Sequence, residues 1–348
     1  MKKDNPFNLT FGKVPKKYIS RYENMEDIVS TFTADNPVAQ TYLIEGVRGS
    51  GKTVLMTGAA VEIGKEQNWV VIDLNASNDL LHDMALRLYD ACANIPKLKE
   101  SGFNISLGGV GIGVGGSKIE RDDVSIIVEY LDHFKKKDIR LLITIDEVLP
   151  NANLRRFASQ FQIFLRKDYQ VFLIMTGLYE NIFDIQNDPS LTFLLRSPKI
   201  NLEPLSIRQI INEYRNVFGI DTEDAKQLAY ITDGYAFAFQ ALGLLMWEYR
   251  DSLEMEEILQ KLDDLLDDFV YKKIWSGLTP KEKEIVRAIG GGDPTKTSLV
   301  CEKAGCTAST FTKYKDRLEV KGILENPAYG YVRLKLPRFY QVVKDYQM

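Results

Sequence analysis

Short, nearly continuous apolar runs recur along the first two hundred residues. Such runs are typical of parallel strands buried on both faces, where neither face carries polar side chains. Between them lie segments whose apolar residues recur at helical spacing. Alternation of this kind predicts an α/β fold with a five-stranded parallel sheet, its fifth strand following Arg196. The other four expected strands are 41–44, 69–74, 141–147 and 171–177, and the expected helices between them include 79–92, 122–134 and 153–166.

Beyond residue 202 the pattern changes to helical periodicity alone. We expect an all-α lid with helices at 207–218, 222–232, 236–250 and 254–269. From residue 271 a capping box with proline at the first helical position, Thr279 to Glu282, predicts a helix over 281–289. A helix-turn-helix and two short strands joined by a turn then predict a winged helix, with elements at 297–304, 309–320, 322–324 and 331–336. The predicted domains are 1–202, 203–270 and 271–348.

Composition places the chain among soluble globular proteins. It has 348 residues, of which 45% are hydrophobic and 26% charged. Its three cysteines show no paired spacing, which suits a reducing, cytoplasmic environment. The first residues lack the apolar segment of a secretory signal, and no apolar run is long enough to cross a bilayer, so no membrane partner is expected. Two histidines exclude a histidine-rich metal site.

The formal net charge of −4 conceals an uneven distribution. Residues 271–348 carry 15 Lys and Arg against 8 Asp and Glu, whereas the rest of the chain carries 29 against 40. A basic segment attached to an acidic body favours a polyanionic partner, and duplex DNA is the leading candidate. The alternative is a solvated basic face with no partner. Winged helices also serve as protein contacts or packing modules, so the fold alone does not establish DNA binding.

One segment fits the phosphate-loop pattern G-x-x-x-x-G-K-[ST] without a gap. Its glycines let the backbone curl so that N–H groups face a polyphosphate, and the helix that follows directs its positive dipole end at the same anion. Within it, Lys52 is expected to reach the β- and γ-phosphates of ATP, and the Thr53 hydroxyl to bind Mg²⁺. The expected nucleotide-binding residues are Gly46, Val47, Arg48, Gly49, Ser50, Gly51, Lys52 and Thr53.

The apolar run at 141–145 ends in two carboxylates, Asp146 and Glu147. Asp146 is expected to hold the water shell of the Mg²⁺ ion. Glu147 is expected to orient and deprotonate the attacking water as the general base. An Asp-Glu pair at a strand end is common as a simple exit to the surface, so its weight comes from the phosphate loop upstream.

Two further residues have less specific signals. Thr176, at the end of the strand 171–177, is a candidate sensor of the γ-phosphate or the lytic water, or a strand-end threonine without a ligand. Arg196 is a candidate for stabilising γ-phosphate charge on a neighbouring subunit, which would require an ATP-dependent homo-oligomer. A solvated arginine or a local ion pair is the alternative.

Residues 101–118 are rich in glycine and contain Gly111, Gly113 and Gly116 at the spacing of a dinucleotide fingerprint. The glycines alternate with Val110, Ile112 and Val114 at strand period. This alternation favours a protruding β-hairpin over a second nucleotide site.

Taken together, the phosphate loop, the strand ending at Glu147, Thr176-Gly177 and the run Leu191–Ser206 resemble the archaeal-type ATPase family. That family lies in the AAA+/STAND branch, close to archaeal replication initiators. The resemblance implies a P-loop sheet, a helical lid and a C-terminal winged helix. The lid segment Gly234-Tyr235-Ala236 stands where the family usually has Gly-x-Pro, so no sensor arginine is assigned in the lid.

The function expected from these features is that of a P-loop ATP hydrolase acting as a nucleotide-dependent switch, associated with DNA through its winged helix. The main alternative is a STAND-type signalling or scaffold ATPase whose winged helix binds protein. A nucleotide-binding module with negligible turnover is disfavoured by Glu147.

Overall fold

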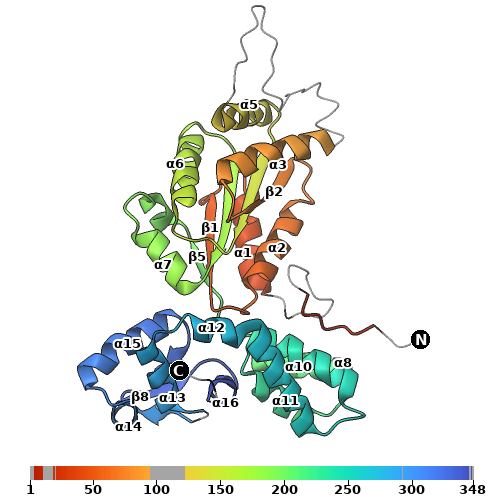
Figure 1. Ribbon diagram of the computed structural model, residues 1–348. Helices are drawn as coiled ribbons and strands as arrows, with labels where there is room; N and C mark the ends of the chain where they lie inside the picture. The colour runs from red at the N-terminus through yellow and green to blue at the C-terminus, as the bar shows by residue number, and fades with distance from the viewer. Residues whose placement is uncertain are drawn as a thin grey trace, which may run out of the picture.

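A computed structural model describes residues 4–10, 19, 21–94, 122–291, 293–344 and 346. The predicted hairpin at 101–118 lies outside these residues. The first part of the chain forms a five-stranded parallel sheet in the order β2-β3-β4-β1-β5 (Figure 1). The predicted α/β fold with five parallel strands is therefore confirmed. The strands are β1 Thr41–Glu45, β2 Trp69–Asn75, β3 Arg140–Asp146, β4 Val171–Gly177 and β5 Lys199–Asn201.

Both faces of the sheet are covered, which explains the continuously apolar strands. Along β4, Phe172 and Ile174 pack toward α1 and α2, whereas Leu173 and Met175 pack toward α3, α5, α6 and α7. Successive residues of β4 are thus buried against helices on opposite faces of the sheet. The covering helices are α1 Tyr22–Thr33, α2 Lys52–Ile63, α3 Leu80–Asn94, α5 Asp123–Lys136, α6 Ala152–Arg166 and α7 Tyr179–Asn187.

The predicted lid helices are present with nearly the expected bounds. Gly219, at a φ of 65°, ends the first of them, and the Asp221 carboxylate caps the second by accepting from the Asp224 N–H at 2.9 Å. They lie at the end of the sheet where β1 leads into the phosphate loop (Figure 1). The helices are α8 Ile207–Phe218, α9 Thr222–Thr232, α10 Ala236–Tyr249 and α11 Met255–Leu266.

The helix α11 does not stop at the predicted boundary near residue 270. It continues through a π-helical turn, η2 Asp267–Tyr271, into α12 Lys272–Ser276. The buried Tyr271 hydroxyl donates to the carbonyl of Pro337 at 2.5 Å, and Arg338 forms a two-pronged ion pair with Asp263 of α11. The lid and the C-terminal elements consequently share one hydrophobic core.

The C-terminal elements follow the order helix, strand, helix, helix, strand, strand of a winged helix. The predicted capping box is present, since the Thr279 hydroxyl accepts from the Glu282 N–H and Glu282 accepts from the Thr279 N–H. Both wing strands are shorter than predicted: Gly322, at a φ of 68°, turns the chain before the first, and the second ends at Leu334. The elements are α13 Pro280–Ile289, β6 Thr295–Lys296, α14 Thr297–Lys303, α15 Ala308–Val320, β7 Leu324–Glu325, β8 Tyr331–Leu334 and α16 Phe339–Val343.

No helix among the described residues combines the length and the apolar character that spanning a membrane requires.

Candidate active site

The phosphate loop connects the end of β1 at Glu45 to the start of α2 at Lys52. Two of its glycines have left-handed backbones, Gly49 with a φ of 76° and Gly51 with a φ of 95°. These conformations are costly for residues with a Cβ, so the loop shape depends on glycine at both positions. At Gly49 a Cβ atom would also lie 2.2 Å from the Tyr235 hydroxyl, which leaves no room for a side chain.

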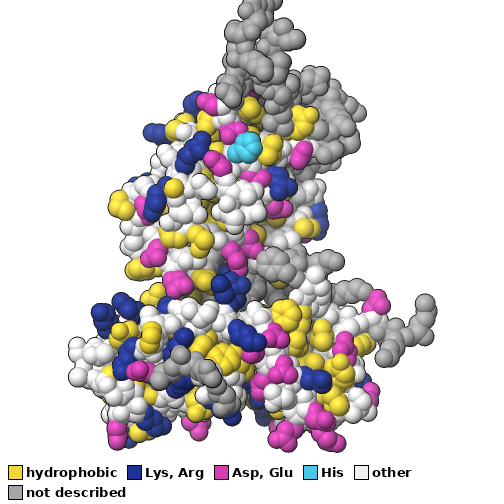
Figure 2. Space-filling view, viewed as in Figure 1, with side chains coloured by type: hydrophobic (Ala, Val, Ile, Leu, Met, Phe, Trp, Pro, Cys, Tyr) yellow, Lys and Arg dark blue, Asp and Glu magenta, His cyan; other side chains and the backbone are white. Residues whose placement is uncertain are grey.

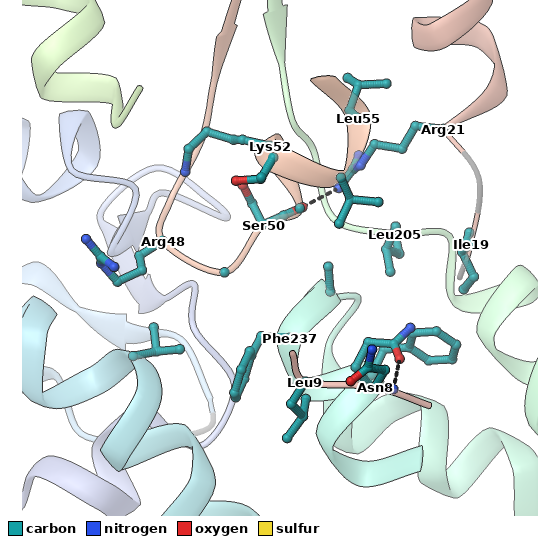
Figure 3. Close-up of a pocket in the computed structure, with 18 of the residues that line it drawn as sticks. Asn8, Leu9, Ile19, Arg21, Arg48, Ser50, Lys52, Leu55, Leu205 and Phe237 are labelled. Atoms are coloured by element: carbon teal, nitrogen blue, oxygen red, sulfur yellow. Dashed lines mark hydrogen bonds between the residues drawn. The ribbon is translucent and has the colours of Figure 1, made fainter. Parts of the chain in front are cut away.

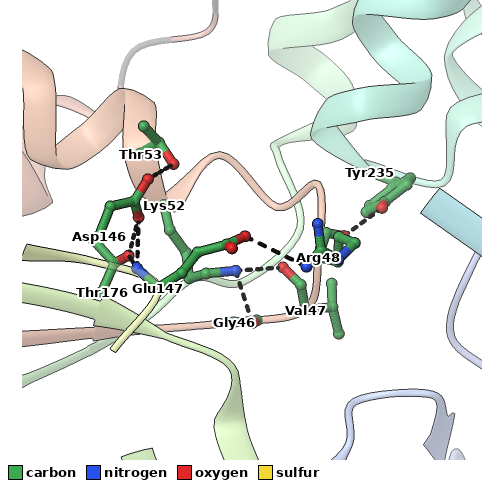
Figure 4. A network of polar contacts seen from close by, with 9 residues as sticks. All are labelled: Gly46, Val47, Arg48, Lys52, Thr53, Asp146, Glu147, Thr176 and Tyr235. Atoms are coloured by element: carbon green, nitrogen blue, oxygen red, sulfur yellow. Dashed lines mark hydrogen bonds and ion pairs between the residues drawn. The ribbon is translucent and has the colours of Figure 1, made fainter. Parts of the chain in front are cut away.

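Lys52 is buried at the base of the loop, with only 7% of its surface exposed. Its ammonium donates to the carbonyls of Gly46 at 3.1 Å and Val47 at 2.8 Å (Figure 4). Burial lowers the pKa of Lys52 from 10.5 to about 8, although the nearby Asp146 and Glu147 carboxylates act in the opposite direction. The loop therefore holds a buried cation whose charge is incompletely compensated by its surroundings.

The side chains of Thr53, Asp146 and Thr176 form one polar cluster. They come from the first turn of α2, the end of β3 and the end of β4. One Asp146 oxygen accepts from the Thr53 hydroxyl at 2.7 Å, and the other accepts from the Thr176 hydroxyl (Figure 4). The parallel sheet brings these ends together at its carboxyl edge, which is where ligands bind in α/β folds.

Glu147 follows Asp146 in an unusual backbone conformation. Its φ is 53°, which is uncommon for a residue other than glycine and costs free energy. The Glu147 N–H donates to Asp146 Oδ1 at 3.1 Å and to Thr176 Oγ1 at 3.2 Å, and these bonds anchor the turn. The carboxylate points away from Asp146 toward the loop, and its side chain is 55% exposed. There it pairs with the Arg48 guanidinium at 3.5 Å.

Arg196 lies apart from this cluster. It ends the 3-10 helix η1 Thr192–Arg196, just before β5 begins, and it is exposed. The neighbouring Ser197 hydroxyl contacts the Thr41 hydroxyl at 2.6 Å, at the start of β1. Arg196 is thus near the amino edge of the sheet, whereas the phosphate loop is at the carboxyl edge. It does not line the pocket of its own chain.

A pocket of about 730 Å³ opens beside the loop (Figure 3). The phosphate loop and Glu147 supply its polar wall, and the N-terminal segment and the lid supply most of its apolar wall. The Arg21 guanidinium donates to the Ser50 carbonyl at 3.3 Å, and the Asn8 N–H donates to the Gln240 side-chain oxygen at 3.1 Å. The apolar lining includes Leu9, Ile19, Met25, Leu205, Phe237 and Leu244.

Within residues 15–21 the structure describes Ile19 and Arg21, and both line the pocket. Sequence reasoning did not identify Asn8, Phe237 or Gln240, because these side chains reach the pocket through tertiary packing and belong to no motif.

The lid is hydrogen-bonded to the loop at two adjacent carbonyls. The Tyr235 hydroxyl donates to the Arg48 carbonyl, and the Phe237 N–H donates to the Gly49 carbonyl at 3.1 Å. Burial raises the pKa of Tyr235, so this hydroxyl keeps its proton and remains a donor. No motif in the sequence predicted this contact.

The C-terminal elements also reach the loop. Gly322, which follows α15, lies so close to Val47 that a Cβ at this position would be 2.4 Å from a Val47 methyl and 2.8 Å from the Tyr179 ring. Lys335, just after β8, is 3.9 Å from the Glu203 carboxylate. The C-terminal elements and the phosphate loop are therefore in direct contact.

The donors of this site fit a nucleoside triphosphate with a divalent cation. The Ser50 hydroxyl is buried without a hydrogen-bond partner among the described residues, beside the left-handed glycines and the start of α2. A bound phosphate would give this hydroxyl a hydrogen-bond partner. The Thr53 hydroxyl and the Asp146 carboxylate are oxygen donors, which Mg²⁺ prefers.

Comparisons with known proteins agree with the architecture. A family model described as a domain of unknown function (DUF8462) matches residues 268–343. No curated protein matches the chain. Among solved structures, the Aeropyrum pernix ORC2 protein, solved as ADPNP-ADP complexes, is 14% identical with a TM-score of 0.64, covering 97% of this chain and 96% of the other.

A second solved structure, Cdc6p from Pyrobaculum aerophilum, is 16% identical with a TM-score of 0.50 and covers 96% of each chain. At these identities the likeness concerns the fold. The chain therefore shares the overall fold of these two proteins along nearly its whole length.

Proposed function

We propose, on the premise of this fold, that the chain is a Mg-ATP-dependent ATP hydrolase acting as a nucleotide-dependent switch on duplex DNA. The observation that carries the proposal is the hydrogen-bonded cluster of Thr53, Asp146 and Thr176 beside the buried Lys52. A cation, a metal-binding hydroxyl and carboxylate, and a second hydroxyl from three separate elements converge at one edge of the sheet. Proposed with it is a division into an ATPase domain (1–202), a lid (203–270) and a winged helix (271–348).

Each polar group has a role in this proposal. Residues 46–51 provide backbone N–H groups for the phosphates, and Lys52 provides the cation that faces the β- and γ-phosphates. Thr53 and Asp146 would hold Mg²⁺, which neutralises developing phosphoryl charge when it is bound. Thr176 orients Asp146 and the turn at Glu147. Glu147 accepts the proton of the attacking water as the general base.

The DNA part of the proposal rests on fewer groups than the composition indicates. Several cations of residues 271–348 are ion-paired within the chain. Lys315 pairs with Glu319 at 3.6 Å, and Lys321 pairs with Glu282 at 3.0 Å. Lys and Arg side chains are nevertheless visible over the region of α15 in Figure 2. On this helix Lys313 and Arg317 are exposed.

Replacing Lys313 by Ala should reduce the salt dependence of DNA binding by the full-length protein. Each cation that contacts a phosphate releases about one counterion, so the slope of log K against log salt should become less negative by about one. Fluorescence anisotropy with a labelled duplex across a salt series measures the slope. Arg333→Gln is the matched control, because Arg333 already pairs with Glu325, and it should leave the slope unchanged. Identical slopes for wild type and Lys313→Ala would contradict this binding mode.

A protein-binding role for the winged helix, as in a STAND-type ATPase, is the second candidate. It is favoured by the pairing of Arg333 with Glu325 and Arg338 with Asp263, which uses wing-side cations inside the molecule. Absence of DNA binding by the full-length chain at low salt would replace the first candidate with this one.

The exposed position of Arg196 suits a role in a neighbouring subunit's site. In such an assembly, Arg196 of one subunit reaches the ATP bound to the next. Mixing Arg196→Ala with Lys52→Met protein should then restore part of the hydrolysis that each variant lacks alone, because some sites combine an intact loop with an intact arginine. Phosphate release from the mixture at several ratios measures the recovery. A strictly monomeric ATP-bound protein in sedimentation, or no recovery at any ratio, would remove the basis for this role.

A further inference from the structure

Arg48 contacts both the side chain of Glu147 and the lid. Its guanidinium pairs with the Glu147 carboxylate at 3.5 Å, and its backbone carbonyl accepts from the hydroxyl of Tyr235 in the lid (Figure 4). The phosphate-loop pattern leaves this position unrestricted, so the motif assigns no role to the Arg48 side chain. The network therefore runs from the lid through one loop residue to the proposed base.

At the lid end the connection is tightly constrained. Tyr235 is buried, with 6% of its surface exposed, and it stands immediately before α10. The Phe237 N–H binds the next loop carbonyl, that of Gly49, at 3.1 Å. Since a Cβ at Gly49 would collide with the Tyr235 hydroxyl, the tyrosine fits closely against the loop. A displacement of α10 must then move the backbone of Arg48 or break both hydrogen bonds.

At the other end only the main chain of Glu147 is held by the sheet. Asp146 and Thr176 bind its N–H, whereas its side chain is half-exposed and makes its ion pair with Arg48. The Asp146 carboxylate is oriented by Thr53 and Thr176 instead. The direction of the Glu147 carboxylate therefore depends on Arg48, while that of Asp146 does not.

We propose that Arg48 is a positioning residue for Glu147, and that the Tyr235 hydroxyl makes this positioning depend on the lid. The inference rests on the proposed hydrolase function and adds to it the means by which lid placement reaches the general base. When the lid lies on the loop, Tyr235 fixes the Arg48 backbone and the guanidinium holds the base against the loop. When α10 moves away, the base loses this support although the phosphate-binding groups stay in place.

Replacing Arg48 by Ala should lower kcat about tenfold and change KM less than about twofold, because the base is misdirected while the phosphate-binding backbone remains. Arg48→Lys should recover part of kcat, since a cation is restored. In the Glu147→Gln background, Arg48→Ala should have no further effect, because the group that it positions is gone. An Arg48→Ala enzyme with wild-type kcat, or a full additional loss in the double variant, would overturn the inference.

Amide hydrogen exchange of the protein without nucleotide gives a readout independent of turnover. Tyr235→Phe keeps the ring and removes the hydroxyl, so exchange at the Phe237 N–H and the start of α10 should become faster, while Arg48→Ala, which keeps the carbonyl, should leave this exchange unchanged. Unchanged exchange in Tyr235→Phe would contradict the role of the lid.

The same variants separate this inference from the proposed function. If Glu147→Gln hydrolyses ATP at the wild-type rate, the function fails and Arg48 has no base to position. If Glu147→Gln is slow but Arg48→Ala is not, the function stands and only the role of Arg48 is wrong.

Discussion

Glu147→Gln should bind ATP as well as the wild-type protein and hydrolyse it about a hundredfold more slowly, which is the usual effect of removing a general base. The amide keeps the size of the carboxylate but cannot take the proton of water. The anchoring bonds of residue 147 to Asp146 and Thr176 are made by its backbone N–H, so the turn should persist. Titration calorimetry measures binding, and phosphate release measures turnover.

The control for this experiment is Glu223→Gln. Glu223 is an exposed carboxylate in the first turn of α9, and it does not line the pocket. This variant should hydrolyse ATP at the wild-type rate. Turnover in Glu147→Gln equal to that of the control would eliminate Glu147 as the base.

Lys52→Met should lose roughly a hundredfold in ATP affinity, because a charge-assisted contact worth about 2–3 kcal/mol is removed.

The Lys52→Met variant should also be more stable toward unfolding than the wild type at pH 7. Burial lowers the pKa of Lys52 to about 8, so the folded state binds this proton less well than the unfolded chain does. Wild type pays this cost in full below pH 8, and methionine does not.

The pH dependence of this stability difference tests whether burial disfavours the charged form of Lys52. Between about pH 8 and 10.5 the unfolded chain holds the Lys52 proton and the folded protein does not, so the stability of wild type rises with pH relative to Lys52→Met. Chemical denaturation of both proteins from pH 7 to 10.5 measures the difference, which should shrink over this range. A difference that grows would mean that the folded protein favours the charged lysine.

The sheet and the phosphate loop were predictable because each has a local signature. Continuous apolar runs follow from burial on both faces, as Phe172 and Leu173 on opposite sides of β4 illustrate. The spacing from Gly46 to Thr53 is a chemical requirement for enclosing phosphates. The proximity of Thr53 to Asp146, 93 residues apart, follows once the loop after β1 and the end of β3 are placed at the same edge of a parallel sheet.

Other parts of the site depend on packing that no local pattern encodes. The pairing of Arg48 with Glu147 depends on a left-handed backbone at residue 147, which the sequence does not reveal. The contact between Gly322 and Val47 joins segments 275 residues apart in the chain, through the docking of one subdomain on another. The surplus of positive charge after residue 271 was visible, but its partial neutralisation by Glu325, Asp263 and Glu282 was not.

The hydrophobic core that the lid shares with the C-terminal elements has a consequence for how the molecule unfolds. The centroids of the Tyr271 and Phe339 rings lie 4.9 Å apart in an edge-to-face contact. Residue 271 also lies within an uninterrupted helical run from the lid into the C-terminal elements. Neither the lid nor the C-terminal elements can therefore open without exposing the core of the other. The two should melt as one cooperative unit. Because Phe237 and Gln240 of this unit line the pocket, any ligand bound there raises the melting temperature of α15 as well, by mass action alone.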